Sequence, residues 1–196
     1  MKKVIFFSHN RHKINEISKL FKGSNINVLS LKNFSNIKKP EENGSSFKEN
    51  SKIKSRYGFK LLKLPCFADD SGICISALKN FPGIKSKRYL IESGGCDKAF
   101  TTIINKTKKF SDSRAYFQTS ISLTIDHDKT FFFNGVIKGN ISSKPKGGGG
   151  FHYDPIFIPK GYNKTFAEMS TEEKNKISHR AIAAKKLKKY LLHLFN

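Results

Sequence analysis

The chain has 196 residues, of which 37% are apolar and 18 are phenylalanine, and no long linker or internal repeat divides it. It can bury one proper core, so we expect a single domain over residues 1–196, with two lobes around a cleft. No apolar run approaches the roughly 18 residues of a membrane span, which excludes a transmembrane segment.

The net charge of +22 raises nucleic acid or an anionic membrane as a partner. The lysines are nevertheless scattered through every segment, alongside many Asn, Ile and Phe residues, as the bias of an A+T-rich genome would produce. The charge alone is therefore weak evidence for nucleic-acid binding. Three cysteines without a C-x-x-C pair favour neither a disulfide framework nor a zinc site, and they fit a reducing cytoplasm.

The first half of the chain predicts alternating strands and helices. Residues 4–7 are short and continuously apolar, as in a strand buried on both faces. A capping box at Ser46 to Glu49 marks the start of a helix that reaches roughly residue 60. A further helix is expected at about 13–21, a strand at 26–29, and two short strands at 66–68 and 73–76 on either side of an acidic turn.

The second half changes to longer β-rich runs after a helix that follows Gly94-Gly95. Residues 115–125 and 130–137 predict a long antiparallel hairpin. A short strand at 155–158, a capping box at Ser170 to Glu173 and a final helix complete the pattern, with one apolar stripe formed by Ile177, Ala181, Ala184, Leu187 and Leu191. The fold class is α/β, with a mixed, partly antiparallel central sheet.

Ser8 to Lys13 leaves a buried strand and enters a helix, where backbone N–H groups lack partners. These groups, with the Ser8 hydroxyl, the Asn10 amide and the Lys13 ammonium, would hold phosphate oxygens. The segment lacks the glycines of a Walker loop. The alternative interpretation is a capped helix with an exposed lysine.

Asp69-Asp70-Ser71-Gly72 places two carboxylates at the end of an apolar strand, where they are costly to desolvate without a metal or hydrogen-bond donors. On an extended backbone, adjacent side chains point to opposite faces, so one of the two enters a given site. Mg2+ suits one or two carboxylates completed by water and phosphate. The acidic segment at 41–44 could supply a further ligand. An ordinary Asp-Ser-Gly turn is the alternative.

Phe151 to Asp154 follow four glycines, and an aromatic ring there could stack on a base, an interaction worth roughly 1–3 kcal/mol. His179 and Arg180, at a helix start, could donate to keto groups or phosphates. The alternatives are core filling for the aromatic residues and helix capping for the second cluster.

Taken together, these segments resemble the inosine triphosphate pyrophosphatase family, in family order from residue 4 to about 190. The matching segments are residues 8–16, 42–50, 68–72, 81–84, 150–157, and 167–169 through 173–175 to 178–180. The resemblance implies an elongated α/β fold with helices on both sides of the sheet. It also implies a homodimer and Mg2+-dependent hydrolysis of ITP, dITP or XTP to the monophosphate and pyrophosphate.

Carried over residue by residue, the resemblance assigns Mg2+ to Glu42 and Asp70, with Asp70 also activating the attacking water. The implied substrate-binding residues are Ser8, His9, Asn10, Arg11, His12, Lys13, Lys54, Ser71, Phe151, His152, Tyr153, Asp154, Lys174, His179 and Arg180. The chain departs from the family pattern at His152, where a glycine is usual, and at Lys85 and Lys87, where tyrosine and alanine are usual.

Two other functions fit parts of the sequence. One is a pyrophosphatase of modified pyrimidine nucleotides, as in a neighbouring family of similar architecture. The other is a basic nucleic-acid-binding protein with a vestigial cleft, which the acidic pairs argue against, because they would repel a phosphate backbone.

Overall fold

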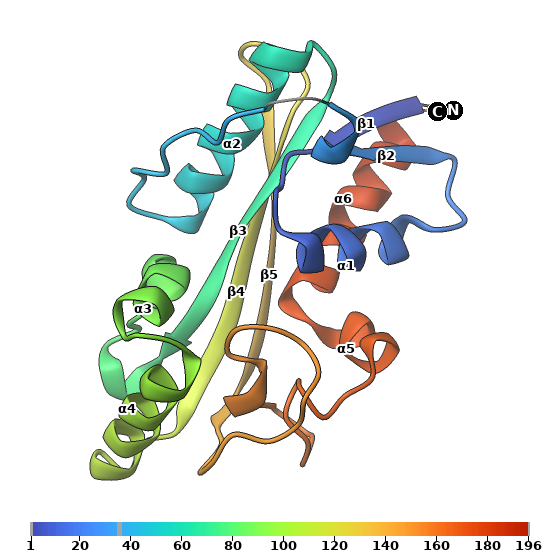
Figure 1. Cartoon of the computed structure of the whole chain (residues 1–196). Helices are drawn as coiled ribbons and strands as arrows, with labels where there is room; N and C mark the ends of the chain where they lie inside the picture. The colour runs from blue at the N-terminus through green and yellow to red at the C-terminus, as the bar shows by residue number, and fades with distance from the viewer. Residues whose placement is uncertain (1, 35–36, 196) are drawn as a thin grey trace. The chain divides into compact units, whose positions relative to one another are not determined.

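The computed structural model describes residues 2–34 and 37–195 (Figure 1). Within them the strands form one six-stranded sheet in the order β2-β1-β3-β4-β5-β6. β1 runs parallel to β2 and to β3, whereas β5 and β6 are antiparallel, so the sheet is mixed as predicted. The strands are β1 (Lys2–Phe6), β2 (Ile26–Ser30), β3 (Cys66–Ile75), β4 (Arg114–Thr124), β5 (Thr130–Ile141) and β6 (Phe157–Pro159).

The α-helices in this described part are α1 (Arg11–Phe21), α2 (Phe47–Leu62), α3 (Ser86–Glu92), α4 (Cys96–Lys109), α5 (Thr171–Ile177) and α6 (His179–Phe195). Short 3-10 helices lie at Leu31–Asn33, Ser76–Leu78, Gly83–Lys85 and Asp154–Ile156. The sequence patterns did not predict α3. None of the helices in the described ranges is long and apolar enough to cross a membrane.

The chain divides into two compact units. The first unit contains Met1–Asp70, Thr119–Gly135 and Arg180–Asn196, and the second contains Ser71–Gln118 and Val136–His179. The single-domain organisation and the cleft between lobes stay predictions.

The first unit is built around β1, which is buried on both faces as its continuous apolar run predicted. Val4 and Phe6 pack in a cluster with α1 and α6, while Ile5 and Phe7 pack in a separate cluster with residues of α2. Side chains alternate along a strand, so these two clusters lie on opposite faces. Helices therefore cover both faces of the sheet in this unit (Figure 1).

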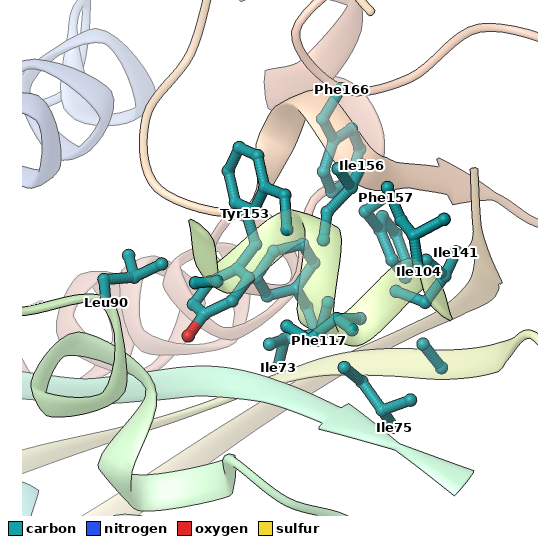
Figure 2. Packing of buried hydrophobic residues seen from close by; sticks show 14 of the residues in the cluster. Ile73, Ile75, Leu90, Ile104, Phe117, Ile141, Tyr153, Ile156, Phe157 and Phe166 are labelled. Atoms are coloured by element: carbon teal, nitrogen blue, oxygen red, sulfur yellow. The ribbon is translucent and has the colours of Figure 1, made fainter. Parts of the chain in front are cut away.

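The second unit has an aromatic core (Figure 2). The Phe117 ring lies 4.8 Å from the Phe157 ring and 5.9 Å from that of Phe166, measured between ring centroids. Tyr153 is buried in the same cluster, and its hydroxyl donates to the Ser86 carbonyl over 2.8 Å. The interpretation of this segment as partly core-filling is confirmed for Tyr153.

The predicted acidic turn is wrong. Residues 66–75 form one continuous strand, β3, with Asp69 to Gly72 inside it. Gly72 allows this because a Cβ there would lie 2.2 Å from the Gly83 carbonyl oxygen, so the close approach of a neighbouring segment requires glycine. Gly72, which suggested a turn in the sequence, is thus required for close packing inside a strand.

Two C-terminal boundaries also differ from the prediction. The expected final helix is interrupted at Ser178, which is extended with φ −62° and ψ 153°, so Ile177 ends α5 and His179 begins α6. The strand expected at 155–158 begins only at Phe157, after a 3-10 turn. The capping box of Ser170 and Glu173 is confirmed.

β4 and β5 are neighbours in the sheet, and the chain turns between them over residues 125–129, where the Ile125 N–H donates to the Lys129 carbonyl. At their other end, the Ile141 N–H donates to the Ser113 carbonyl over 2.7 Å.

Gly58 in α2 is the position where packing most directly opposes helix propensity. A Cβ there would lie 2.5 Å from both Cys66 Sγ and a ring carbon of Phe7. Alanine gains about 0.5–1 kcal/mol in a helix interior, but overpacking costs about 1–3 kcal/mol. We expect Gly58→Ala to lower the free energy of unfolding, measured by chemical denaturation.

The control is Gly148→Ala, where the space is open. Little change is expected for that variant. An increase in the stability of Gly58→Ala would contradict the close packing of α2.

Candidate functional site

The phosphate segment predicted at Ser8 to Lys13 forms the start of α1, but its backbone donors are partly occupied. Asn10 is the N-cap, and its Oδ1 accepts from the N–H groups of His12 at 3.0 Å and Lys13 at 3.2 Å. The Asn10 N–H in turn donates to Ser8 Oγ at 3.2 Å. The capped helix that the sequence left open as an alternative is thus present, and its cap satisfies the His12 and Lys13 N–H groups. Phosphate binding by this segment stays a prediction.

The side chains of this segment point in different directions. His9 Nε2 donates to the Ile37 carbonyl over 3.0 Å, while Arg11 and His12 are exposed on the first turn of α1. Lys13 instead turns inward, with its Nζ 2.9 Å from Asp69 Oδ2. Of the six residues, Lys13 is the one placed in a buried charge cluster.

Glu42 and Asp70 converge on one ammonium group, that of Lys54. Lys54 Nζ lies 2.6 Å from Glu42 Oε2 and 3.4 Å from Asp70 Oδ1. Glu42 lies in the acidic loop before α2, Lys54 lies in α2 itself and Asp70 lies in β3. The two carboxylates named as metal ligands are thus close together in the first unit.

Asn50 connects this cluster to the loop that carries Glu42. Its Nδ2 donates to Asp70 Oδ2 over 3.3 Å, and its Oδ1 accepts from the Gly44 N–H at 2.8 Å. A side chain at residue 44 would be only 2.8 Å from Asn50 Oδ1, so glycine permits this approach. Asn50 therefore fixes the loop relative to Asp70.

The donor set of this cluster fits a hard divalent cation. Within residues 2–34 and 37–195, no group of three or more His, Cys, Asp or Glu side chains could hold a metal by itself. Mg2+ is commonly held by one or two carboxylates together with waters and substrate phosphates. Glu42 and Asp70 provide that number of carboxylates, at a place where they already share a cationic partner.

Asp69, adjacent to Asp70, belongs to a different set of contacts. Its Oδ2 accepts from Lys13 Nζ at 2.9 Å and from Arg180 Nε at 3.1 Å. The other side of the Arg180 guanidinium forms an ion pair with Glu16 of α1. The extended backbone of β3 thus sends the two aspartates to separate partners, which confirms the alternation predicted for them.

Burial and nearby charges shift the pKa values of Asp69 and Asp70 in opposite directions. Burial disfavours the charged form of Asp69, but Lys13 and Arg180 outweigh it and hold its pKa well below the usual range. Burial raises the pKa of Asp70, and Lys54 opposes the shift without cancelling it. Asp70 is therefore the more basic of the two carboxylates.

The lysines respond to the same environment. Burial is the largest cause of the lowered pKa of Lys13, which Asp69 only partly offsets. Burial also acts against the charged form of Lys54, yet Asp70 and Glu42 together raise its pKa.

In the second unit, Phe151, Asp154 and Lys174 form one cluster. Lys174 Nζ lies 2.6 Å from Asp154 Oδ2 and 4.8 Å from the centroid of the Phe151 ring. The Phe151 N–H donates to Asp154 Oδ2 over 2.7 Å. The buried ion pair of Asp154 and Lys174 therefore fixes the backbone and ring of Phe151, the residue predicted to stack on the purine base.

His152 adopts a left-handed backbone conformation, with φ +55°. This region favours glycine, which gives a physical reason for the glycine usual at this position in the family. The His152 ring lies edge-on to Phe151 at 4.9 Å. The substitution thus adds a ring beside Phe151 at the cost of backbone strain.

His179 stacks on Phe117, with ring centroids 4.7 Å apart and an interplanar angle of 8°. It lies in the second unit, while the next residue, Arg180, belongs to the first. Ser71 is half-buried in β3, and Tyr153 is buried in the aromatic core. Through Phe117, His179 contacts the same aromatic core that contains Tyr153.

Sequence patterns did not single out Asn50 and Glu16, and they named Asp69 as a carboxylate without its partners Lys13 and Arg180. In the structure each of the three is a polar residue buried to 7% exposure or less. Asn50 and Glu16 occupy the buried face of a helix, and Asp69 directly follows an apolar run. Buried polar groups usually have specific partners, but a sequence cannot identify which ones.

The fold is that of a mixed α/β protein with a carboxylate–lysine cluster suited to a cation and an anion. The chain belongs to the Ham1 family, whose model matches residues 4–190. This confirms the family resemblance inferred from the motifs.

Relatives and solved structures agree over nearly the whole chain. A dITP/XTP pyrophosphatase of Borreliella burgdorferi is 41% identical over 205 residues, covering 100% of both chains. One of Porphyromonas gingivalis is 39% identical over 193 residues, covering 98% of each. The Ham1 protein structure from Coxiella burnetii superposes with a TM-score of 0.87 at 34% identity, covering 98% of this chain and 100% of the other.

Asp69 should contribute strongly to stability, because it is the shared counter-ion of two buried cations. We expect Asp69→Asn to lower the free energy of unfolding at neutral pH by about 3–5 kcal/mol, the usual cost of breaking a buried pair. The folded pKa of Asp69 is depressed, so its contribution exists above the unfolded pKa of about 3.9 and declines as the pH falls below it. Chemical denaturation at pH values from neutral to below about 3.9 measures the difference in free energy of unfolding between wild type and Asp69→Asn.

Asp112→Asn is the matched control, because Asp112 pairs with Arg114, whose side chain is 78% exposed. Its removal should change stability little. Two outcomes would contradict the buried role of Asp69. One is an equal loss of free energy of unfolding in Asp69→Asn and Asp112→Asn, and the other is a difference between wild type and Asp69→Asn that does not shrink on acidification.

Proposed function

We propose that this chain hydrolyses non-standard purine nucleoside triphosphates, namely ITP, dITP and XTP, to the monophosphate and pyrophosphate. Membership of the Ham1 family and the names of its dITP/XTP pyrophosphatase relatives support this activity. It would keep such nucleotides from incorporation into DNA and RNA. The cytoplasm is the proposed compartment and a homodimer the proposed assembly.

The observation that carries the proposal is the convergence of Glu42 and Asp70 on Lys54. Hydrolysis of a triphosphate concentrates negative charge on phosphoryl oxygens and on the leaving pyrophosphate. A bound Mg2+, held by Glu42 and Asp70, would polarise those oxygens and lower the pKa of water. Lys54 supplies a further positive charge at the same place.

Asp70 is the proposed general base. Its pKa is raised by burial, so it holds a proton better than an exposed aspartate would. Asn50 orients the Asp70 carboxylate by donating to Oδ2, while Oδ1 accepts from Lys54 Nζ. Asp69 is less suited to the role, because Lys13 and Arg180 stabilise its ionised form.

The lysines of the first unit are proposed to bind phosphate, and the aromatic cluster of the second unit is proposed to bind the base. Lys13 and Lys54 are buried ammonium groups, which interact with phosphate more strongly than exposed ones. Phe151, held by Asp154 and Lys174, is the proposed stacking surface. Selection of a keto purine is assigned to His179 and Arg180, because they carry N–H donors for a keto oxygen, whereas adenine offers an amino group there. Two of the Arg180 nitrogens already donate to Asp69 and Glu16.

Purified protein with Mg2+ should release pyrophosphate from dITP or XTP much faster than from dATP or dGTP. The measurement is pyrophosphate release under initial-rate conditions over a panel that also contains modified pyrimidine triphosphates. A preference for a pyrimidine would redirect the proposal to that class. Absence of turnover together with salt-sensitive nucleic-acid binding would favour the basic binding protein instead.

Asp70→Asn should lower kcat by roughly 100- to 10,000-fold, because it removes the proposed base and weakens the proposed metal site. The control is Asp126→Asn, at an exposed aspartate in the turn after β4, which should retain wild-type turnover. If Asp70→Asn keeps most of its activity, the proton acceptor must be another group.

A further inference from the structure

One face of β4 carries hydroxyl side chains, yet it is buried. Residues 120–124 read Ser-Ile-Ser-Leu-Thr, and all of them are at most 1% exposed. Ile121 and Leu123 pack in the apolar cluster with α6, so Ser122 and Thr124 point to the other face. A strand with this alternation is usually half-exposed, and here its polar face is covered instead.

The element that meets this hydroxyl face is α2, through Ser55. The Ser55 hydroxyl accepts from Ser122 Oγ at 2.9 Å and shares a hydrogen bond with Thr124 Oγ1 at 2.8 Å. Thr124 Oγ1 continues the chain to Thr130 Oγ1 at 3.2 Å. We call Ser55, Ser122 and Thr124 the hydroxyl bridge. All three are fully buried.

The apolar contacts of α2 with the sheet are less directional. Tyr57, Phe59 and Leu62 pack against the apolar cluster of β1 and β3, and Gly58 allows close approach to Cys66. Apolar burial depends on area and tolerates small shifts along a helix axis, whereas a hydrogen bond weakens steeply when its geometry changes. α2 also donates to Asp70 of β3 and to Thr130 of β5. The hydroxyl bridge is the directional contact between α2 and β4.

The position of α2 matters because it carries Lys54 and Asn50. Lys54 precedes Ser55 directly, and its ammonium contacts both Glu42 and Asp70. Asn50 lies in the first turn of the same helix and contacts Asp70 and the Gly44 backbone. Any shift of α2 therefore moves both partners of Asp70 together.

We propose that Ser55 is a positioning residue, whose hydroxyl bridge to Ser122 and Thr124 holds α2 at the place where Lys54 and Asn50 meet Asp70. The inference rests on the proposed function for its catalytic consequence, but the bridge itself is a property of the fold. It explains why the buried surface between α2 and β4 is polar, although an apolar pairing there could be equally stable.

Ser55→Ala and Ser51→Ala form a matched pair for the test. Both serines lie on the buried face of α2 and are fully buried. The Ser51 hydroxyl donates to the Lys48 carbonyl of its own helix, and within the described part of the chain it forms no hydrogen bond to the sheet. Misplacing catalytic groups by about 1 Å can cost about 100-fold in rate. We expect Ser55→Ala to lower kcat for dITP by about tenfold or more, while Ser51→Ala stays within about twofold of wild type.

A second pair at Thr124 separates the hydroxyl from the packing. Thr124→Ser keeps the oxygen and should retain kcat, whereas Thr124→Val keeps the shape, loses the hydroxyl and should lower kcat. The double variant Ser55→Ala with Thr124→Val should lose little more than Ser55→Ala alone, because Ser55→Ala already removes the bond to Thr124. Additive losses would contradict the bridge.

Hydrogen exchange of the α2 backbone amides provides the readout that does not depend on turnover. Exchange is compared under conditions in which the two variants have the same free energy of unfolding. Ser55→Ala should then increase the exchange rates of the α2 amides more than Ser51→Ala does. If wild type turns over no triphosphate, the proposed function fails, and hydrogen exchange still decides whether Ser55 fixes α2. If wild type is active but the two serine variants show equal kcat and equal exchange, the positioning role is overturned.

Discussion

The structure depends on how two adjacent carboxylates inside one buried strand are neutralised. Asp69 and Asp70 lie in β3, and its extended backbone sends Asp69 to Lys13 and Arg180 and sends Asp70 to Lys54 and Asn50. Isolated buried charges are very costly, so each aspartate needs its partners in place for the strand to be buried. The elements that supply those partners, α1, α2 and the start of α6, are thereby tied to the centre of the first unit.

The same electrostatics separates the chemical roles of the two aspartates. Asp69 is surrounded by cations and is held ionised, which makes it a counter-ion. Asp70 is buried with less compensation, and its pKa is raised. A carboxylate in that condition favours a further cation or a proton. Two neighbouring aspartates thus acquire pKa values shifted in opposite directions from their surroundings alone.

Polar contacts also organise the parts around the clusters. Asn50 joins the Glu42 loop to Asp70, and the hydroxyl bridge ties α2 to β4. In the second unit, Asp154 holds the Phe151 backbone and the Lys174 ammonium at once. In each case one buried side chain satisfies groups from two segments. The apolar cores supply most of the burial, whereas these directional bonds define where the functional side chains lie.

Local patterns in the sequence determined the α/β class, the doubly buried first strand, the Ser170 capping box and the family, because periodicity, caps and motifs are short-range features. They did not determine that β3 is one continuous strand or that the helix breaks at Ser178. The backbone conformation at these positions depends on packing against segments that are distant in the sequence. The resemblance placed Glu42 and Asp70 together at one ion, but nothing in the sequence placed the Lys54 ammonium between the two carboxylates. Which buried carboxylate is a counter-ion, and which hydroxyl face is covered by α2, follow from contacts between residues far apart in the chain, and only the tertiary structure brings those residues together.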